Sequence, residues 1–269
     1  MKLSLSFIGA GNLAEAIINA IAGNADTEIS IFDVNLEQYK KYDGLDINRV
    51  YDLKDIVLCG DIIFLMVKPN DFPELLGGIK DLNLDLSKKI FVSTAAAVST
   101  DFIQKETGQK IAVVRTMPNT PIFTGKGMTA LCRSGNVTDA GFEKVCGIFK
   151  SRGETIILPE ERMNDIIAVN GSSPAYVYLF AEAMLEGAAR LGFDKRAIYP
   201  VVLQSLAGSL DMLIDSGKMP DELIKAVASP NGTTEKALES FYADDFAGII
   251  ERAMTACANR AEEMAREFN

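Results

Sequence analysis

The sequence contains no histidine among its 269 residues. This absence excludes Ser-His-Asp hydrolysis, Cys-His chemistry, imidazole metal sites and the usual proton shuttle of hydroxy-acid dehydrogenases. An enzyme built from this sequence must therefore need little acid–base help, or must take it from another side chain or from water.

Cysteine pairs and excess basic charge are also missing. The four cysteines are scattered without a Cys-x-x-Cys pair, so the sequence predicts neither a metal site nor a disulfide framework. Lys and Arg number 27 against 37 Asp and Glu, which gives a formal charge of −10. That charge disfavours nucleic acids and anionic membranes as partners, because both attract a basic surface.

Long apolar runs are absent as well. We find no run that approaches the ~18 apolar residues needed to cross a bilayer. The apolar stretch near the N-terminus resembles a signal peptide, but Asn12, Glu15 and Asn19 interrupt it. We therefore expect a cytoplasmic protein without a membrane segment.

The most informative segment is Leu3 to Leu13, LSLSFIGAGNL, an apolar run that predicts a strand and leads into Gly9-x-Gly11-x-x-Ala14. Gly9 permits a tight turn, Gly11 lets a pyrophosphate approach the backbone, and Ala14 allows close helix packing. The phosphates would then lie at a helix N-terminus, where N–H groups are unpaired. A second apolar run ends in Asp33, 22 residues beyond Gly11, where a carboxylate accepts hydrogen bonds from a ribose. The pattern predicts dinucleotide binding, although such turns also occur for packing alone.

Apolar runs and helical patterns alternate in the first part of the chain, which is typical of a doubly wound parallel sheet of Rossmann type. The expected strands lie near residues 3–8, 28–32, 61–67, 89–94, 111–116, 127–132 and 154–157. Beyond Pro159 the strand signals vanish and helical periodicity takes over. The expected helices cover 160–191 with a break at 172–174, then 194–216, 220–227, a short one after Gly232, and 244–268.

The sequence therefore predicts an α/β dinucleotide-binding domain over 1–158 and an all-α domain over 159–269. The helices of the second domain are rich in Ala, Gly, Met and Leu, as in residues 181–189. That composition suits burial against a second subunit, and a self-contained bundle explains it equally well.

Three further segments carry polar groups on rigid or tightly turned backbone. Arg115–Pro121 places an Asn-Thr pair between two prolines, which suits ligand contact and is also a good turn. Asn170–Tyr176 contains Pro174, which breaks a helix, so its serines can satisfy either a ligand or a plain kink. Ser229–Thr234 contains residues that tolerate positive φ, so its N–H groups can converge on a small carboxylate, while its threonines can also cap a helix.

Together these motifs resemble the pyrroline-5-carboxylate reductase family over essentially the whole chain. The matching segments are the glycine turn at 8–14, Val-Lys-Pro at 67–69, Ser-Thr-Ala-Ala at 93–96, Met-Pro-Asn-Thr-Pro at 117–121, Gly-Ser-Ser-Pro-Ala-Tyr at 171–176 and Ser-Pro-x-Gly-Thr-Thr at 229–234. The resemblance implies a reductase that moves hydride from NADH or NADPH to the C5 imine carbon of 1-pyrroline-5-carboxylate and gives L-proline.

The resemblance also implies roles for particular residues. Cofactor contacts would come from Ile8, Gly9, Ala10, Gly11, Asn12, Leu13, Asp33, Val67, Lys68, Pro69, Ala96 and Asn119, the last four on the nicotinamide side. The substrate carboxylate and ring nitrogen would be held by Ser229, Gly232, Thr233 and Thr234, with the Thr234 hydroxyl as the catalytic group near the nitrogen. The family forms dimers through its C-terminal helices, often assembled further, so a homo-oligomer is implied.

The missing histidine agrees with this chemistry, since a protonated cyclic imine is already electrophilic and becomes an amine that needs no further acid. Asp33 favours NADH, because a carboxylate repels the 2′-phosphate of NADPH. Two alternatives stay open. One is another Rossmann-type imine or β-hydroxyacid reductase, including coenzyme F420-dependent types, although nothing around Lys195 or Lys225 resembles the β-hydroxyacid lysine motif. The other is a non-catalytic NAD(P)-sensing paralogue.

Overall fold

The chain folds into two compact units, which are described separately. The computed structural model describes residues 2–268. One unit comprises Met1–Ser172 together with Cys257–Asn269, and the other comprises Ser173–Ala256.

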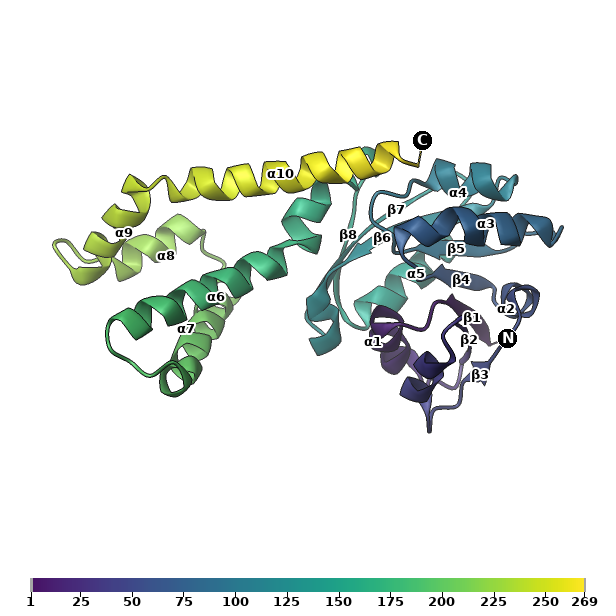
Figure 1. The fold of residues 1–269 in the computed structure, drawn as a ribbon, viewed down its shortest axis with the longest axis horizontal. Coiled ribbons are helices and arrows are strands. Elements are labelled where there is room, and N and C mark those ends of the chain that lie inside the picture. The colour runs from purple at the N-terminus through teal and green to yellow at the C-terminus, as the bar shows by residue number, and fades with distance from the viewer. Residues whose placement is uncertain (1, 269) are drawn as a thin grey trace. The chain divides into compact units, whose positions relative to one another are not determined.

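The first unit is built on an eight-stranded sheet with the order β3-β2-β1-β4-β5-β6-β7-β8 (Figure 1). Its strands are β1 Leu3–Ile8, β2 Thr27–Phe32, β3 Asn48–Arg49, β4 Ile62–Leu65, β5 Ile90–Ser93, β6 Ala112–Pro118, β7 Gly127–Arg133 and β8 Gly153–Ile157. The seven expected strands are confirmed, and the two-residue β3 is an addition. The expectation of a wholly parallel sheet is wrong at one place, because β6 and β7 pair antiparallel while the other neighbours pair parallel.

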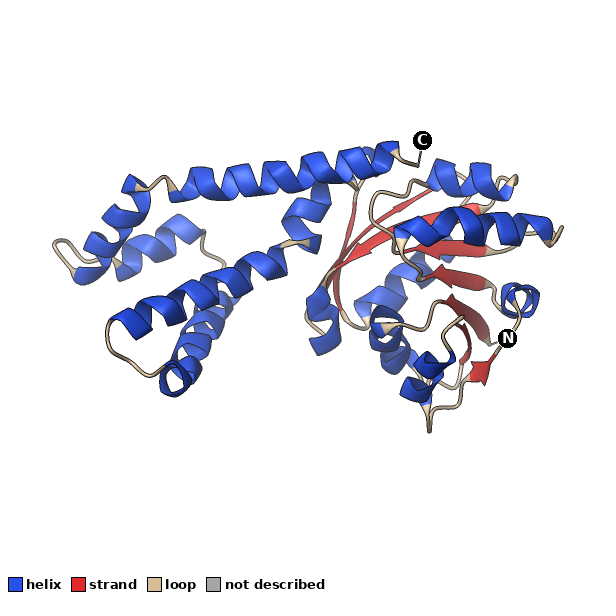
Figure 2. Ribbon diagram, viewed as in Figure 1, coloured by secondary structure: helices blue, strands red, loops and turns tan. Residues whose placement is uncertain are grey.

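Helices cover both faces of this sheet (Figure 2). They are α1 Asn12–Ile21, α2 Leu53–Cys59, α3 Phe72–Asp81, α4 Thr100–Thr107 and α5 Asp139–Lys150, with short turns η1 Leu36–Tyr42, η2 Pro69–Asp71, η3 Thr120–Thr124 and η4 Glu160–Arg162, and the π-helix η5 Ile167–Gly171. One core contains Phe7 stacked on Phe64 with ring centroids 4.5 Å apart, and α1 and α5 cover it. The other contains Phe91 beneath α2, α3 and α4. Because both faces are covered, β4 reads as the uninterrupted apolar run IIFL.

The parallel strands β1, β2, β4, β5 and β6 end at the same edge of the sheet. Ligands of open α/β sheets bind beyond this carboxyl edge, at the point where the strand order reverses. Here the order reverses between β1 and β4. The loops that follow these strands therefore mark where a ligand is expected.

The second unit is helical. It contains α6 Ser173–Arg190, α7 Lys195–Ser216, α8 Pro220–Val227, α9 Thr233–Ala243 and the first part of α10 Phe246–Arg266. The expected break at 172–174 is confirmed as the start of α6, whose second residue is Pro174. Residues 160–171 differ from the expected helix, since they form η4 and the π-helix η5, and α9 is longer than expected with 11 residues.

The last part of α10 belongs to the first unit. The ring of Phe268 meets Phe102 of α4 edge to face, with centroids 5.4 Å apart. Residues 159–172 also group with the sheet by compactness. The division between residues 158 and 159 therefore stays a prediction about functional domains.

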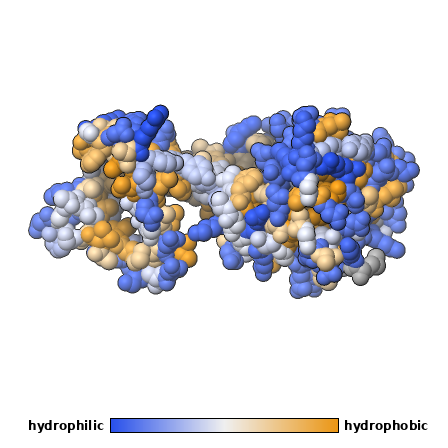
Figure 3. Space-filling model, turned by 90° about the horizontal axis from the view of Figure 1, so that it is seen from below, coloured by the Kyte–Doolittle hydropathy of each residue, from blue (hydrophilic) through white to orange (hydrophobic). Residues whose placement is uncertain are grey.

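The helical unit exposes many apolar side chains. Leu179, Val201, Met212 and Ile214 are among those more than half exposed, and Figure 3 shows hydrophobic residues gathered on its surface. Within the described part of the chain α7 alone is long and apolar enough, by length and composition, to cross a membrane. The expectation that no segment approaches such a span is wrong for this helix, whose mean hydropathy reaches 1.5. Core helices of water-soluble proteins pass the same test.

Candidate active site

The glycine turn after β1 has the geometry of a phosphate cradle. Gly9 has a φ of +98°, and a Cβ there would lie 2.7 Å from the carbonyl oxygen of Met66, so only glycine fits. Gly11 is the N-cap of α1, no side chain caps it, and a Cβ there would meet nothing within 4 Å. The first-turn N–H groups of α1 therefore adjoin open space, where helix N-termini attract anions.

Asp33 lies directly beside this turn at the end of β2. Its Oδ2 accepts a hydrogen bond from the Ala10 N–H at 2.8 Å, and its Oδ1 accepts one from the Asn35 N–H at 2.8 Å. The Tyr39 hydroxyl accepts from the Asp33 N–H at 3.1 Å and donates to the Val50 carbonyl at 2.6 Å. Burial raises the pKa of Tyr39, which keeps this hydroxyl protonated as a donor. The Asp33 carboxylate is thus fixed at the rim of the turn.

A groove of about 480 Å³ opens beside Asp33. All the charged side chains that line it are acidic, and they are Asp33, Asp71 and Glu74. The other lining residues are Ile8, Gly9, Phe32, Val34, Leu53, Val67, Leu75 and Gly78. A mostly apolar groove with a carboxylate at its rim suits an adenosine better than a phosphate.

A cation that the sequence did not point to lies at the N-terminus of α1. Lys41 of η1 donates to the Asn12 side-chain oxygen, and its Nζ lies 3.6 Å from Glu15 Oε2. The sequence gives only a weak indication of this contact, because Lys41 lies 29 residues from Asn12. Its charge adds to the attraction of this helix end for phosphate.

Val67 and the four residues expected on the nicotinamide side follow three neighbouring strands. Val67, Lys68 and Pro69 follow β4, Ala96 follows β5, and Asn119 follows β6. Lys68 is exposed, whereas Ala96 packs against a cluster that includes Met117 and Met163. The structure therefore brings all the expected cofactor residues to the carboxyl edge of one sheet, from Asp33 after β2 to Asn119 after β6.

The residues expected at the substrate lie together in one turn of the helical unit. The Gly232 N–H donates to the Ser229 carbonyl at 2.9 Å, and a Cβ on Gly232 would lie 2.5 Å from Ser229 Oγ. Asn231 has a φ of +59°, and its N–H donates to Glu235 Oε2 at 2.7 Å. Asparagine tolerates this left-handed backbone better than most residues. Gly232 has an ordinary φ of −81°, so it is required by the close approach of Ser229 and not by a positive φ.

The helix α9 begins at Thr233, directly after Gly232 as the sequence suggests, and its N-cap is Gly232 without a side-chain cap. Neither Thr233 nor Thr234 is therefore the capping residue. Thr234 is half-buried and lines a largely apolar cavity of about 740 Å³ within the helical unit.

Comparison with known proteins places this geometry in a family. The family described as pyrroline-5-carboxylate reductase dimerisation matches residues 160–264, and that described as coenzyme F420-dependent NADP oxidoreductase matches residues 4–97. The pyrroline-5-carboxylate reductase of Escherichia coli (strain K12) is 31% identical over 271 residues, which cover 99% of this chain and 100% of that protein. The chain belongs to the pyrroline-5-carboxylate reductase family.

Solved structures of the family agree with this assignment. A pyrroline-5-carboxylate reductase from Coxiella burnetii superposes with a TM-score of 0.90 at 29% identity, covering 98% of this chain and 99% of that one. The Plasmodium falciparum pyrroline carboxylate reductase, solved with NADP bound, superposes with a TM-score of 0.86 at 26% identity, covering 98% of both chains.

In this member of the pyrroline-5-carboxylate reductase family, Asn119 is held by Asn170 of η5. The Asn119 amide donates to Asn170 Oδ1 at 2.9 Å, and its own oxygen accepts from the Met128 N–H at 2.9 Å. The buried Asn170 amide in turn donates to the carbonyls of Met117 and Met128, both at 2.9 Å. The segment that the sequence left open between kink and ligand site thus bonds the loop after β6, and π-helical turns often mark functional sites.

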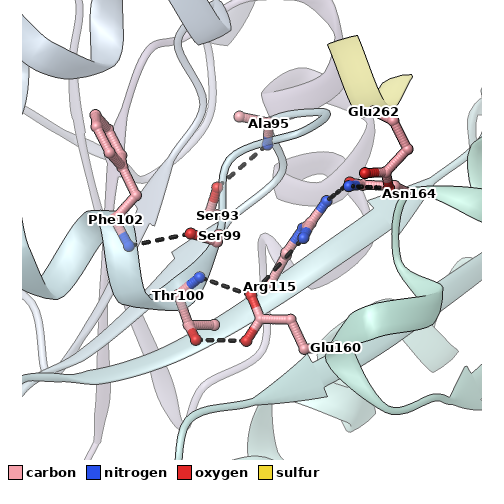
Figure 4. A network of polar contacts seen from close by, with 9 residues as sticks. All are labelled: Ser93, Ala95, Ser99, Thr100, Phe102, Arg115, Glu160, Asn164 and Glu262. Carbon is pink, nitrogen blue, oxygen red and sulfur yellow. Dashed lines mark hydrogen bonds and ion pairs between the residues drawn. The ribbon is translucent and has the colours of Figure 1, made fainter. Parts of the chain in front are cut away.

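A second polar network lies beneath the loop after β5 (Figure 4). Arg115 of β6 is 2% exposed, its Nη2 donates to Asn164 Oδ1 at 2.5 Å, and its Nη1 lies 3.7 Å from Glu160 Oε1. Asn164 donates to Glu262 Oε1 at 2.8 Å. Burial lowers the pKa of Arg115, and the Glu160 carboxylate opposes that shift. Burial also raises the pKa of the neighbouring Cys132 thiol to about 12, which keeps it unreactive.

Proposed function

We propose that this chain is an NAD(P)H-dependent pyrroline-5-carboxylate reductase, which reduces the C5 imine carbon of 1-pyrroline-5-carboxylate to L-proline in the last step of proline biosynthesis. The observation that carries the proposal is the gathering of five loops at one carboxyl edge of the sheet, each at the position for one part of a dinucleotide. Full-length relatives that carry this name support the substrate.

The described residues fit the cofactor. Ile8 to Leu13 would hold the pyrophosphate. Gly9 lets this turn pass close to the Met66 carbonyl, where a side chain would clash, and Gly11 leaves the N-terminus of α1 open to a ligand. Asp33 would accept from the adenosine ribose. Lys68, Pro69, Ala96 and Asn119 would border the nicotinamide ring, and Val67, which lines the groove beside Asp33, would also contact the cofactor. When bound, NAD(P)H supplies the hydride.

The substrate carboxylate would lie on the turn at Ser229, Gly232, Thr233 and Thr234, where the first N–H groups of α9 need acceptors. The Thr234 hydroxyl would accept a hydrogen bond from the protonated ring nitrogen. Hydride adds to C5, the electron pair of the C=N bond moves to nitrogen, and the iminium becomes a neutral amine. No proton donor is consumed, which agrees with a chain that lacks histidine.

The loss of absorbance at 340 nm with purified protein, 1-pyrroline-5-carboxylate and NADH or NADPH tests this function, with proline identified as the product. Turnover would establish the reaction. A folded protein that binds nucleotide but does not turn over would instead favour reduction of another imine or ketone, or a sensor.

The same groove supports a preference for NADH. Asp33, Asp71 and Glu74 are the charged residues that line it, and each repels a 2′-phosphate. We expect a lower KM for NADH than for NADPH, and we expect Asp33→Asn to narrow the ratio of the two kcat/KM values by roughly tenfold, equivalent to about 1.4 kcal/mol. Asp43→Asn, which removes an exposed carboxylate outside the groove, serves as the control. A lower KM for NADPH in the unmodified protein would contradict the preference.

The helical unit supports a homodimer formed through the C-terminal helices, with higher assembly open. Its apolar cavity of about 740 Å³ and its exposed apolar side chains need a cover, and a second copy supplies one of matching chemistry. Such burial would also account for the apolar α7 in a cytoplasmic protein that binds neither membrane nor nucleic acid. Light scattering is expected to give at least twice the chain mass of 29.2 kDa, and a monodisperse monomer would contradict the dimer.

A further inference from the structure

We propose that Glu160 is a positioning residue of the reductase, which holds the loop 94–99 in place beneath the nicotinamide ring. The inference rests on the proposed function, in which Ala96 of this loop borders the ring. Glu160 itself lies outside the groove and the turns assigned to ligands.

Both carboxylate oxygens of Glu160 accept hydrogen bonds from Thr100, the residue that directly follows this loop. Oε1 accepts from the Thr100 N–H at 2.7 Å, and Oε2 accepts from the Thr100 hydroxyl at 2.5 Å (Figure 4). Thr100 is the first residue of α4 and is buried. A carboxylate from a segment 60 residues away thus fixes the point where the loop joins the helix.

The loop needs such support because its own backbone is strained. Ala97 has a φ of +66° and is 2% exposed, although a residue with a Cβ rarely adopts this conformation. Inside the loop, Ser93 Oγ accepts from the Ala95 N–H at 3.3 Å. Strained backbone persists where the surroundings determine it from several sides, and such positions cluster at ligand sites.

The buried Arg115 guanidinium in turn helps to orient Glu160. Arg115 Nη1 lies 3.7 Å from Oε1 and balances its charge, while Arg115 Nη2 donates to Asn164, which itself donates to Glu262. Three residues beyond Glu160, the fully buried Met163 belongs to the cluster against which Ala96 packs. The segment that begins at Glu160 therefore bonds one end of the loop and packs against its middle.

This arrangement predicts that Glu160 affects the binding of only one half of the cofactor. The adenosine half would lie on the glycine turn and Asp33, beside a groove that Glu160 does not line, whereas the nicotinamide half would lie on the loop that Glu160 holds. Loss of the carboxylate should therefore weaken ligands that carry a nicotinamide ring and spare those that lack it.

The test measures the affinity of the full-length protein for NADH and for ADP-ribose, which lacks the ring, by calorimetry. We expect Glu160→Ala to weaken NADH binding and to lower kcat by at least about tenfold, since hydrogen bonds to a charged group are lost. Its ADP-ribose affinity should stay within about twofold, because the adenosine half is untouched. Glu160→Gln, which keeps one acceptor for Thr100, should lie between Glu160→Ala and the unmodified protein.

Glu161→Gln is the matched control, because it removes the same charge from an exposed neighbour and should change neither affinity. Equal weakening of both ligands would overturn the inference in favour of a purely structural role, and unchanged NADH affinity would also overturn it. If Glu160→Ala fails to fold, the NADH and ADP-ribose affinities of Glu160→Gln and Thr100→Val test the inference in the same way. The unmodified protein could fail to reduce 1-pyrroline-5-carboxylate while Glu160→Ala still weakens NADH binding and spares ADP-ribose binding. That result would refute the proposed function and support the positioning role.

Discussion

Replacement of Thr234 by valine is expected to lower kcat/KM for 1-pyrroline-5-carboxylate by roughly 10- to 150-fold, because a hydrogen bond to a charged group contributes about 1.5–3 kcal/mol. Valine matches threonine in size and lines the apolar cavity at least as well, so the helical unit should keep its stability. Steady-state kinetics at saturating cofactor measure the effect.

Two comparisons make the Thr234 result specific. Thr234→Ser retains a hydroxyl and should keep most of the turnover, and calorimetry should find the NADH affinity of Thr234→Val unchanged. Kinetics of Thr234→Val that equal those of the unmodified protein would remove this hydroxyl from the mechanism.

Replacement of Gly9 by alanine is expected to destabilise the protein by roughly 2–4 kcal/mol and to abolish measurable NADH binding. The backbone at Gly9 has a positive φ, and the added methyl group would press against the Met66 carbonyl of the adjacent loop. The turn must then move or the strand ends must separate. Thermal unfolding and calorimetry with NADH measure the two effects.

Gly11→Ala is the matched control for Gly9→Ala. A Cβ at Gly11 meets nothing within 4 Å and the φ of −72° suits alanine, so stability should stay within about 0.5 kcal/mol. The methyl group would occupy the space proposed for the pyrophosphate, so NADH binding should still weaken. Equal stability of the two variants would argue against the strain at Gly9, and full NADH affinity in Gly11→Ala would argue against the proposed phosphate position.

Much of the fold could be predicted from hydrophobic patterns. The buried run of β4 and the glycine turn after β1 are strong local signals, and both elements form where they were expected. The strand β3 was not predicted, because Asn48 and Arg49 are polar and exposed and pair with β2 over only two residues. The antiparallel pairing of β6 with β7 was not predicted either. Strand direction depends on the path of the connecting loop and not on the hydrophobic pattern within either strand.

The supporting polar residues were harder to predict than the loops they support. Arg115 stands in the apolar run of β6, and a charge in a fully buried strand indicates that a partner exists. Nothing in the sequence says that the partners are Glu160 and Asn164, which lie 45 and 49 residues further along. The bonds of Asn170 to Met117 and Met128 are hidden for the same reason, since each joins segments more than 40 residues apart.

The helix α10 has a consequence for how the protein is made. The sheet unit recruits residues 257–268, including Phe268 against Phe102, after the chain has passed through the whole of the helical unit. On the ribosome, every strand of the sheet therefore emerges well before the segment that completes its packing. Until that segment has been synthesised, the apolar surface of α4 lacks its contact with Phe268 and the amide of Asn164 lacks its hydrogen bond to Glu262. Folding of the nucleotide-binding unit should thus finish only after residues 257–268 have been synthesised, long after its glycine turn at residues 9–14.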